Sequence, residues 1–168
     1  IELLERRGIK VSEEHIRKGL KSADWPGRLQ VVSRDPLLIL DGAHNPGAIR
    51  CLSEAIRGGF RYKRLILVLG VMADKDVGGV LRGILPMADS VLFTRPEYYR
   101  AADPETLMRA ASPLGKPGEI QPTLAKALQR AKQMAGREDL ILITGSLFTV
   151  GETMAILDPE TYKPDSIR

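Results

Sequence analysis

Hydrophobic residues recur with two different periods along this chain, and short apolar runs alternate with helical segments from Arg28 onward. Residues 65–69 are apolar without any polar interruption, as expected of a strand that helices cover on both faces. The apolar residues of 124–135 instead recur every three or four positions, which is typical of an amphipathic helix. We expect strands at residues 29–32, 37–40, 65–69, 90–94 and 140–144, a weaker one near 119–121, and helices at 46–58, 76–86, 103–112, 122–135 and 146–157.

Strands that alternate with helices through short connections predict an α/β fold. We expect a Rossmann-like, doubly wound, mostly parallel sheet of six strands. Residues 29–32 and 37–40 are too close in the chain for a parallel crossover. They are therefore expected to pair as an antiparallel hairpin at the edge of the sheet.

The N-terminal segment has a different pattern from the rest. The pattern of residues 1–22 predicts two short helices. Gly8 is expected to end the first helix and Ser12 to cap the second. A turn-forming segment follows at residues 24–27. We expect residues 1–24 to be a linker or the tail of a preceding domain, and residues 25–168 to be the main domain. Because the helical pattern starts at Ile1, we expect the sequence to be cut from a longer chain.

Composition limits the classes of function. The length of 168 residues fits about one domain, and the 43% apolar and 27% charged residues match an ordinary soluble globular protein. The longest apolar run, residues 65–73, is too short for a membrane span of roughly 20 residues. The net charge of +4 comes from scattered bases, which is weak evidence for nucleic acid. We expect neither a membrane nor a nucleic-acid partner.

The chain has one cysteine and no signal-peptide pattern. Cys51 cannot form an internal disulfide, which favours a reducing compartment and a cytoplasmic location. It lies in a helical stripe with Leu52 and Ile56. We therefore expect Cys51 to be a core residue rather than a nucleophile.

Polar segments follow four of the expected strands, and three of these segments contain glycine. Ligands in open parallel sheets bind at the carboxyl ends of the strands, so these segments are the candidate site. They are residues 41–46, 70–76, 95–97 and 144–146.

The segment 41–46 carries the strongest signal. Asn45 and Pro46 suit the N-cap and first position of the following helix, where backbone amides can bind an anion. Asp41 at a strand end suits the hydroxyl pair of a ribose, and His44 suits a phosphate or carboxylate. The alternative is a capped turn with an exposed Asp and His. A metal site is not favoured, because His15 lies in another segment and no Cys/His cluster exists.

Three weaker segments each allow two interpretations. Residues 25–28 form a hinge with Trp25 as an aromatic plug, or place Arg28 to stack on a base or clamp a phosphate. Residues 74–76 are a solvated helix start, or position Lys75 to bind an anion. Residues 144–146 either form the exit of a strand with a helix N-cap, or provide hydroxyl and amide donors, including Ser146, for the carboxylate of a ligand.

Three common catalytic motifs are absent from the sequence. It has no Gly-x-x-x-x-Gly-Lys-[Ser/Thr] phosphate loop, no Gly-x-Gly-x-x-Gly after the first strand, and no Gly-x-Ser-x-Gly nucleophile elbow. The chain therefore offers binding groups at strand ends without a self-sufficient catalytic apparatus.

In this order, the segments Trp25–Leu29, Leu40–Pro46, Gly70–Asp76 and Thr144–Phe148 resemble the bacterial folylpolyglutamate synthase/dihydrofolate synthase family. More specifically, residues 9–157 are similar to its C-terminal, Mur-ligase-type domain. The resemblance implies an ATP-dependent amide ligase. ATP phosphorylates the carboxylate of dihydropteroate or a glutamylated folate, and the amine of L-glutamate attacks the acyl phosphate.

The resemblance also implies roles for single residues. Arg28 and Asp41 match nucleotide contacts, His44 matches a position near the reacting phosphate, and Lys75 and Ser146 match positions that hold L-glutamate. The family's Mg²⁺ ligands and phosphate loop belong to an N-terminal ATPase domain, which becomes a partner of this chain. We therefore expect no metal ligand here, no ligase turnover by the chain alone, and a monomer.

Three other interpretations remain at this point. The first is the C-terminal domain of a cell-wall Mur ligase, which the Trp-Pro-Gly-Arg motif at 25–28 together with the Ala-His-Asn-Pro motif at 43–46 disfavours. The second is a non-catalytic module that binds a nucleotide or a protein partner. The third is a flavodoxin-like redox domain, although the first strand lacks the Ser/Thr-rich phosphate loop of that class.

Overall fold

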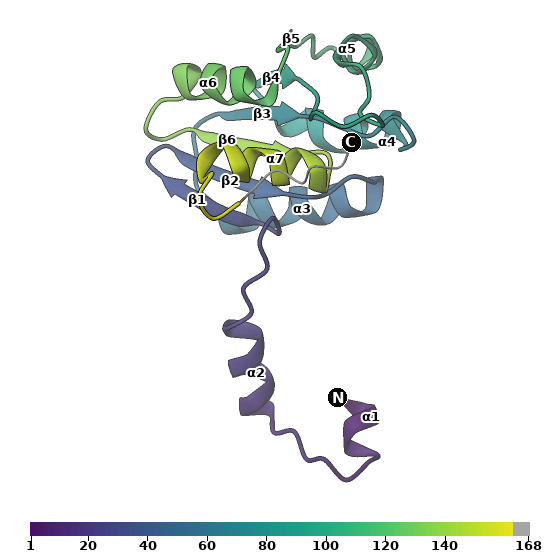
Figure 1. The fold of residues 1–168 in the computed structure, drawn as a ribbon, viewed down its shortest axis with the longest axis vertical. Coiled ribbons are helices and arrows are strands. Elements are labelled where there is room, and N and C mark those ends of the chain that lie inside the picture. The colour runs from purple at the N-terminus through teal and green to yellow at the C-terminus, as the bar shows by residue number, and fades with distance from the viewer. Residues whose placement is uncertain (163–168) are drawn as a thin grey trace.

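The computed structural model describes residues 1–162 and arranges six strands in one mixed sheet (Figure 1). The strand order is β1-β2-β6-β3-β4-β5. The strands are β1 (Gln30–Arg34), β2 (Leu37–Asp41), β3 (Leu65–Leu69), β4 (Ser90–Phe93), β5 (Glu119–Ile120) and β6 (Leu140–Thr144). β1 pairs antiparallel with β2, and every other neighbouring pair is parallel. The predicted fold class, with its antiparallel edge strand, is confirmed.

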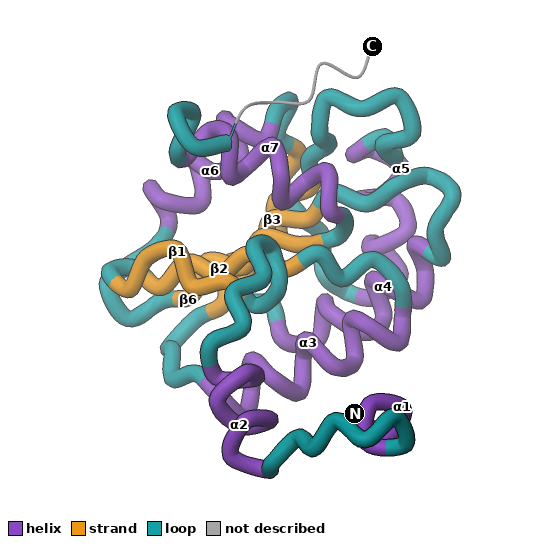
Figure 2. Tube along the Cα trace, turned by 60° about the horizontal axis from the view of Figure 1, so that its bottom comes forward, coloured by secondary structure: helices purple, strands orange, loops and turns teal. Residues whose placement is uncertain are grey.

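Helices cover both faces of the sheet (Figure 2). They are α3 (Pro46–Gly59), α4 (Val77–Ile84), α5 (Pro104–Ala111), α6 (Leu124–Met134) and α7 (Leu147–Leu157), with short 3₁₀ turns at Leu85–Met87 and Ser112–Leu114. The first three pack into one apolar cluster, and α6 and α7 pack into a second on the other face.

The central strand β3 shows why the sheet needs both layers. Leu65, Leu67 and Leu69 belong to the cluster under α3, α4 and α5, whereas Ile66 and Val68 belong to the cluster under α6 and α7. All five residues are buried. Because burying such a side chain contributes about 1.5–3 kcal/mol, an uninterrupted apolar strand is stable only between two helical layers.

Most element boundaries differ by one or two residues from the sequence-based expectation, and two of the differences have a clear physical reason. β1 begins at Gln30 rather than Leu29, because Leu29 has a φ of +45° and this conformation does not continue a strand. The expected helix 76–86 ends at Ile84 and continues only as a 3₁₀ turn. Pro86 lies in that turn and lacks the amide hydrogen that an α-helix would use.

The expected core position of Cys51 is wrong. Its side chain is exposed, whereas Ile49, Leu52, Ser53 and Ile56 form the buried face of α3. Two helical positions advance the direction of a side chain by about 200°. Cys51 therefore points away from the face that Ile49 begins.

The N-terminal segment forms an arm that extends away from the sheet (Figure 1). It contains α1 (Glu2–Glu5) and α2 (Glu13–Lys21), and neither helix has a buried residue. Ser12 caps α2 as predicted, since its hydroxyl accepts from the amide of His15 at 3.2 Å. No helix within residues 1–162 is long and apolar enough to cross a membrane. The end of the expected main domain, residues 163–168, lies outside the described residues.

Candidate functional site at the carboxyl ends of the strands

The carboxyl ends of four parallel strands stand in one row. Asp41 of β2 pairs with Thr144 of β6, Thr144 with Leu69 of β3, and Leu69 with Phe93 of β4. The segments that follow these residues therefore leave the sheet side by side. As predicted, all four polar segments meet at one edge.

The exit segments after β2, β3 and β6 are joined by backbone hydrogen bonds. The amide of Gly70 donates to the carbonyl of Thr144 at 3.1 Å, and the amide of Gly145 donates to that of Ala43 at 3.1 Å. Gly145 has a φ of +113°, and a Cβ on it would lie 2.5 Å from the carbonyl oxygen of Gly70. Only glycine fits here, because both the conformation and the contact exclude a side chain.

Asp41 fastens the loop before β1 to the end of β2. One carboxylate oxygen accepts from the amide of Leu29 and the other from the amide of Ala43, each at 2.8 Å. The amide of Gly42 also donates to the carbonyl of Gly27 at 2.9 Å. The bonds that Leu29 and Gly27 form with Asp41 and Gly42 connect residues 12 and 15 positions apart. They bring the segments 25–29 and 40–46 together.

This fastening places Arg28 over the strand end. One guanidinium nitrogen of Arg28 lies 3.4 Å from the point where a Cβ of Gly42 would stand. The side chain is exposed and forms no salt bridge with any residue in 1–162. Trp25 does not act as the expected aromatic plug, because 73% of it is exposed. Arg28 is thus an exposed cation beside the end of β2, and its contact with a nucleotide stays a prediction.

His44 is half-buried at the same strand end, and its Nδ1 lies 2.8 Å from the carbonyl oxygen of Gly42. Because a carbonyl oxygen only accepts, Nδ1 carries the hydrogen of this contact, and Nε2 is the ring nitrogen left for another partner. Asn45 caps α3 as predicted, with its side-chain oxygen accepting from the amide of Ala48 at 2.9 Å. Pro46 occupies the first turn.

Lys75 lies in the exit segment of β3. Its ammonium is 2.9 Å from the Asp74 carboxylate, and 34% of its side chain is exposed. Hydrogen bonding from Lys75 lowers the pKa of the Asp74 carboxyl group. Asp76 caps α4 by accepting from the amide of Gly79 at 2.8 Å. Within residues 1–162 no hydrogen bond or salt bridge links Lys75 to Asp41 or His44.

Ser146 is 2% exposed and caps α7. Its hydroxyl oxygen accepts from the amide of Thr149 at 2.9 Å and lies 2.8 Å from the Thr149 hydroxyl oxygen. The Thr149 hydroxyl donates to the carbonyl of Gly70 at 2.7 Å, so the Ser146 hydroxyl must donate to Thr149. The Ser146 hydroxyl hydrogen is thus donated within the protein. The hydrogen bonds from Ser146 to Thr149 and from Thr149 to Gly70 link α7 to the end of β3.

Thr149 and Arg100 also belong to this edge, although neither residue stands in a sequence motif that would single it out. The backbone of Arg100 accepts from the amide of Ala73 at 2.8 Å, and its guanidinium donates to the hydroxyl of Tyr98 at 3.2 Å. The Tyr98 ring stacks on Phe148 of α7, with centroids 3.8 Å apart. After the larger effect of Lys75, the charge of Arg100 also lowers the pKa of Asp74. Arg100 therefore lies near the Lys75 segment.

The site does not fit a metal ion. No group of three His, Cys, Asp or Glu side chains in the described part of the chain could hold one. Asp41 uses both carboxylate oxygens on backbone amides, and Asp76 caps a helix. The Asp41 and Asp76 carboxylates are each engaged with backbone amides, and neither belongs to a group of three possible metal ligands in the described residues.

An open, mostly parallel sheet with polar groups gathered at its carboxyl edge is a ligand-binding α/β domain. The family described as "Mur ligase, glutamate ligase domain" matches residues 27–147. The chain belongs to this family.

Curated relatives have related names. A "probable bifunctional folylpolyglutamate synthase/dihydropteroate synthase" of Halobacterium salinarum is 40% identical over 89% of this chain and 18% of that protein. The "dihydrofolate synthase/folylpolyglutamate synthase" of Escherichia coli is 36% identical over 92% of this chain and 36% of that protein. The chain thus spans about a third or less of these relatives.

Solved structures agree with this assignment. The E. coli FolC structure in complex with DHPP and ADP has a TM-score of 0.84 and 34% identity, covering 94% of this chain and 37% of that one. A bifunctional folylpolyglutamate synthase/dihydrofolate synthase with Mn, AMPPNP and L-glutamate bound has a TM-score of 0.82 and 34% identity, covering 92% and 37%.

Proposed function

We propose that this chain is the C-terminal domain of an ATP-dependent ligase that joins L-glutamate to dihydropteroate, to folylpolyglutamates, or to both. The row of strand ends carries this proposal, because it gathers Arg28, Asp41, His44, Lys75 and Ser146 at one edge of a glutamate ligase domain. The named relatives and the ligands of the similar solved structures support the substrates.

The β2 end forms the nucleotide half of the proposed site. Arg28 supplies a charge that pairs with a phosphate or stacks on a base. The Asp41 carboxylate oxygens each accept one backbone hydrogen bond and retain lone pairs for ribose hydroxyls. The same carboxylate holds Arg28 in place, so Asp41 acts both directly and through the loop that it fastens.

The proposed reaction has two steps. A carboxylate oxygen of the acceptor attacks the γ-phosphorus of ATP and ADP leaves. The amine of L-glutamate then attacks the acyl carbon, inorganic phosphate leaves, and the nitrogen loses a proton. His44 stands at the strand end with Nε2 directed away from its bond to Gly42. In this position it can orient a phosphate oxygen or accept that proton.

The ends of β3 and β6 form the glutamate half. Lys75 offers an ammonium for a carboxylate of L-glutamate, and Arg100 adds a second cation near the same segment. Ser146 uses its hydroxyl within the protein, so we propose that it serves L-glutamate by holding the first turn of α7 in place. The sequence-based prediction of a direct Ser146 contact stays untested.

The described residues contain neither a phosphate loop nor a metal site. We propose that a preceding domain, to which residues 1–24 connect, supplies the phosphate loop and the Mg²⁺ ligands of a monomeric enzyme. Closing that domain onto the β2 end would complete the site. The 168-residue chain alone is then expected to show no turnover, and ATP- and glutamate-dependent ligation by it would contradict this.

The test uses the full-length protein and measures ADP release with dihydropteroate or tetrahydrofolate as acceptor. Arg28→Gln should raise the KM for ATP about tenfold or more, the effect of losing a charged hydrogen bond, and leave the KM for L-glutamate unchanged. Lys75→Gln should raise the KM for L-glutamate and leave the KM for ATP unchanged. Asp41→Ala should also raise the KM for ATP, although it additionally releases the amide of Leu29.

Arg50→Gln is the matched control, since Arg50 is exposed on α3 and forms no ion pair within residues 1–162. No ADP release with either acceptor would overturn the proposed function. If each variant shifted both KM values together, the division into two halves would be wrong.

A further inference from the structure

The segment between β4 and α5, residues 94–103, contains the polar residues 95–97, to which the proposed function gives no role. We call it the β4–α5 connection. It starts at the carboxyl end of β4, in the row of strand ends. It contacts α7 near its start and the exit segment of β3 near its end, and these contacts join two parts of the candidate site.

Two side chains of α7 hold the start of the β4–α5 connection. The Glu152 carboxylate accepts a hydrogen bond from the amide of Glu97 at 2.6 Å. The Phe148 ring stacks on the Tyr98 ring, with centroids 3.8 Å apart. Because Phe148 and Glu152 are four positions apart, they lie on the same face of α7. One helix face thus fixes two successive residues of the connection.

The end of the β4–α5 connection holds the exit segment of β3. The amide of Ala73 donates to the carbonyl of Arg100 at 2.8 Å. The amide of Ala102 donates to the carbonyl of Val71, also at 2.8 Å, and an antiparallel bridge lies between these two bonds. Within the described residues, these are the backbone hydrogen bonds that join the stretch 71–73 to a distant segment.

Lys75 lies between this stretch and α4. On its carboxyl side, the amide of Val77, the first residue of α4, donates to the Lys75 carbonyl at 2.8 Å. On its amino side, the Lys75 amide donates to the carbonyl of Met72 at 3.1 Å. The position of Lys75 therefore depends on residues 71–73 and, through them, on the β4–α5 connection.

Glu152 occupies a place that solvation alone does not favour. Burial raises the pKa of its half-buried carboxyl group, the hydrogen bond from the Glu97 amide lowers it, and the Glu97 charge raises it again, so that the pKa is raised overall. A partly desolvated carboxylate beside a second carboxylate costs free energy, which its hydrogen bond offsets only in part. Groups in such surroundings are frequent at functional sites.

We propose that Glu152 and Phe148 are positioning residues for the glutamate half of the site, because they fix the β4–α5 connection that sets the place of Lys75. This role rests on the proposed function, in which Lys75 binds a carboxylate of L-glutamate. Both residues act through the backbone bonds between the connection and the exit segment of β3. Loss of either contact should therefore weaken the binding of L-glutamate and spare the binding of ATP at the end of β2.

Steady-state kinetics of the full-length protein test this role, with ADP release measured at varied L-glutamate and at varied ATP. Glu152→Ala removes the acceptor and should raise the KM for L-glutamate about fivefold, while the KM for ATP and kcat stay within about twofold. Glu152→Gln keeps an oxygen that can accept from the Glu97 amide, and should return the KM for L-glutamate to within about twofold of the unmodified protein. Equal increases in the Ala and Gln variants would overturn the role of this hydrogen bond.

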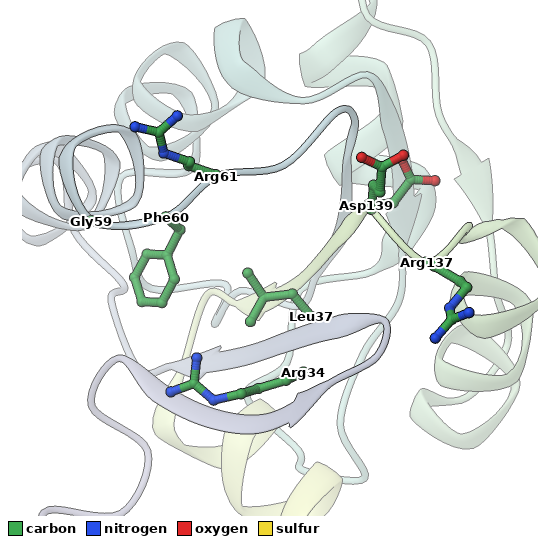
Figure 3. Close-up of a pocket in the computed structure, with 8 residues that line it drawn as sticks. Arg34, Leu37, Gly59, Phe60, Arg61, Arg137 and Asp139 are labelled. Atoms are coloured by element: carbon green, nitrogen blue, oxygen red, sulfur yellow. The ribbon is translucent and has the colours of Figure 1, made fainter.

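The aromatic contact has its own variant and control. Phe148→Leu keeps an apolar side chain without the stacked ring and should raise the KM for L-glutamate about threefold. Phe60→Leu is the matched control, since Phe60 is also half-buried and lines a cavity of about 260 Å³ at the amino ends of β2 and β6 (Figure 3). It should leave both KM values unchanged. An equal effect of the two substitutions would indicate a general loss of packing and contradict the role of Phe148.

A double variant tests whether Glu152 acts through Lys75. In the Lys75→Gln background, Glu152→Ala should raise the KM for L-glutamate no further, because residues that act through one another are not additive. A full further increase would place the effect of Glu152 elsewhere and overturn the proposal. If the unmodified protein releases no ADP, the proposed function fails as well. Normal ADP release with unchanged KM values in Glu152→Ala and Phe148→Leu would overturn the positioning role alone.

Discussion

Replacing Thr149 by Val removes one hydroxyl group from the buried contact between α7 and the end of β3. That hydroxyl donates to the Gly70 carbonyl at 2.7 Å and accepts from the Ser146 hydroxyl at 2.8 Å. Thr149 is fully buried, and Val has nearly the same shape and is also β-branched. The substitution therefore leaves two polar groups unpaired with little change in packing.

The expected loss of stability follows from those two groups. Leaving a buried donor or acceptor unsatisfied costs about 1–3 kcal/mol, and the added methyl group returns about 1 kcal/mol. We expect Thr149→Val to lower the free energy of unfolding by about 1–5 kcal/mol, with a central value of about 3 kcal/mol. In a domain of this size, the central value corresponds to a decrease in Tm of about 5–15 °C.

Urea unfolding of the 168-residue chain, followed by circular dichroism, measures this loss. Thr149→Ser is the control, because it keeps both hydrogen bonds and removes one methyl group, at a cost of about 1 kcal/mol. The expected order of stability is Thr, Ser, Val. If the Val variant equals or exceeds the Ser variant, the hydroxyl does not hold α7 to β3.

Further predictions concern backbone conformation and pH. Gly145→Ala should destabilise the chain by more than about 2 kcal/mol, because it combines a φ of +113° with a Cβ 2.5 Å from the Gly70 carbonyl oxygen. The control is Gly58→Ala in α3, whose new Cβ meets nothing within 4 Å and should stabilise the chain by about 0.5–1 kcal/mol. Equal changes in the free energy of urea unfolding for the two variants would contradict both predictions. Hydrogen bonding from Arg64 lowers the pKa of Asp139 in the folded state, so its stabilisation is present above the unfolded pKa of about 3.9 and is lost as the pH falls through the folded pKa. The urea midpoint should therefore fall less steeply below pH 4 in Asp139→Asn than in the unmodified chain, and equal slopes would refute this.

Features that depend on local sequence could be predicted. β3 is recognisable because an unbroken apolar run is stable only between two layers. The starts of α2, α3 and α7 are recognisable because Ser12, Asn45 and Ser146 accept hydrogen bonds from amides three positions onward. The positions of Asp41 at the end of β2 and of Lys75 in the segment after β3 could also be predicted. The fold class alone places the carboxyl ends of parallel strands at one edge of the sheet.

Features that depend on distant contacts could not be predicted. The start of β1 depends on Leu29, whose amide bonds to Asp41 twelve residues later. Thr149 gains its role from Gly70, which is 79 residues earlier in the chain. None of these pairings has a signal in the residue types alone.

The position of β6 links the assembly of the site to the order of synthesis. β2 and β3 follow one another in the chain, yet β6, the last strand in the described residues, lies between them. The ends of β2 and β3 therefore have no shared neighbour until residues 140–144 enter the sheet. Asp41, His44 and Lys75 leave the ribosome well before this strand does. The two halves of the proposed site are therefore expected to come together only when the C-terminal part of the fold has formed.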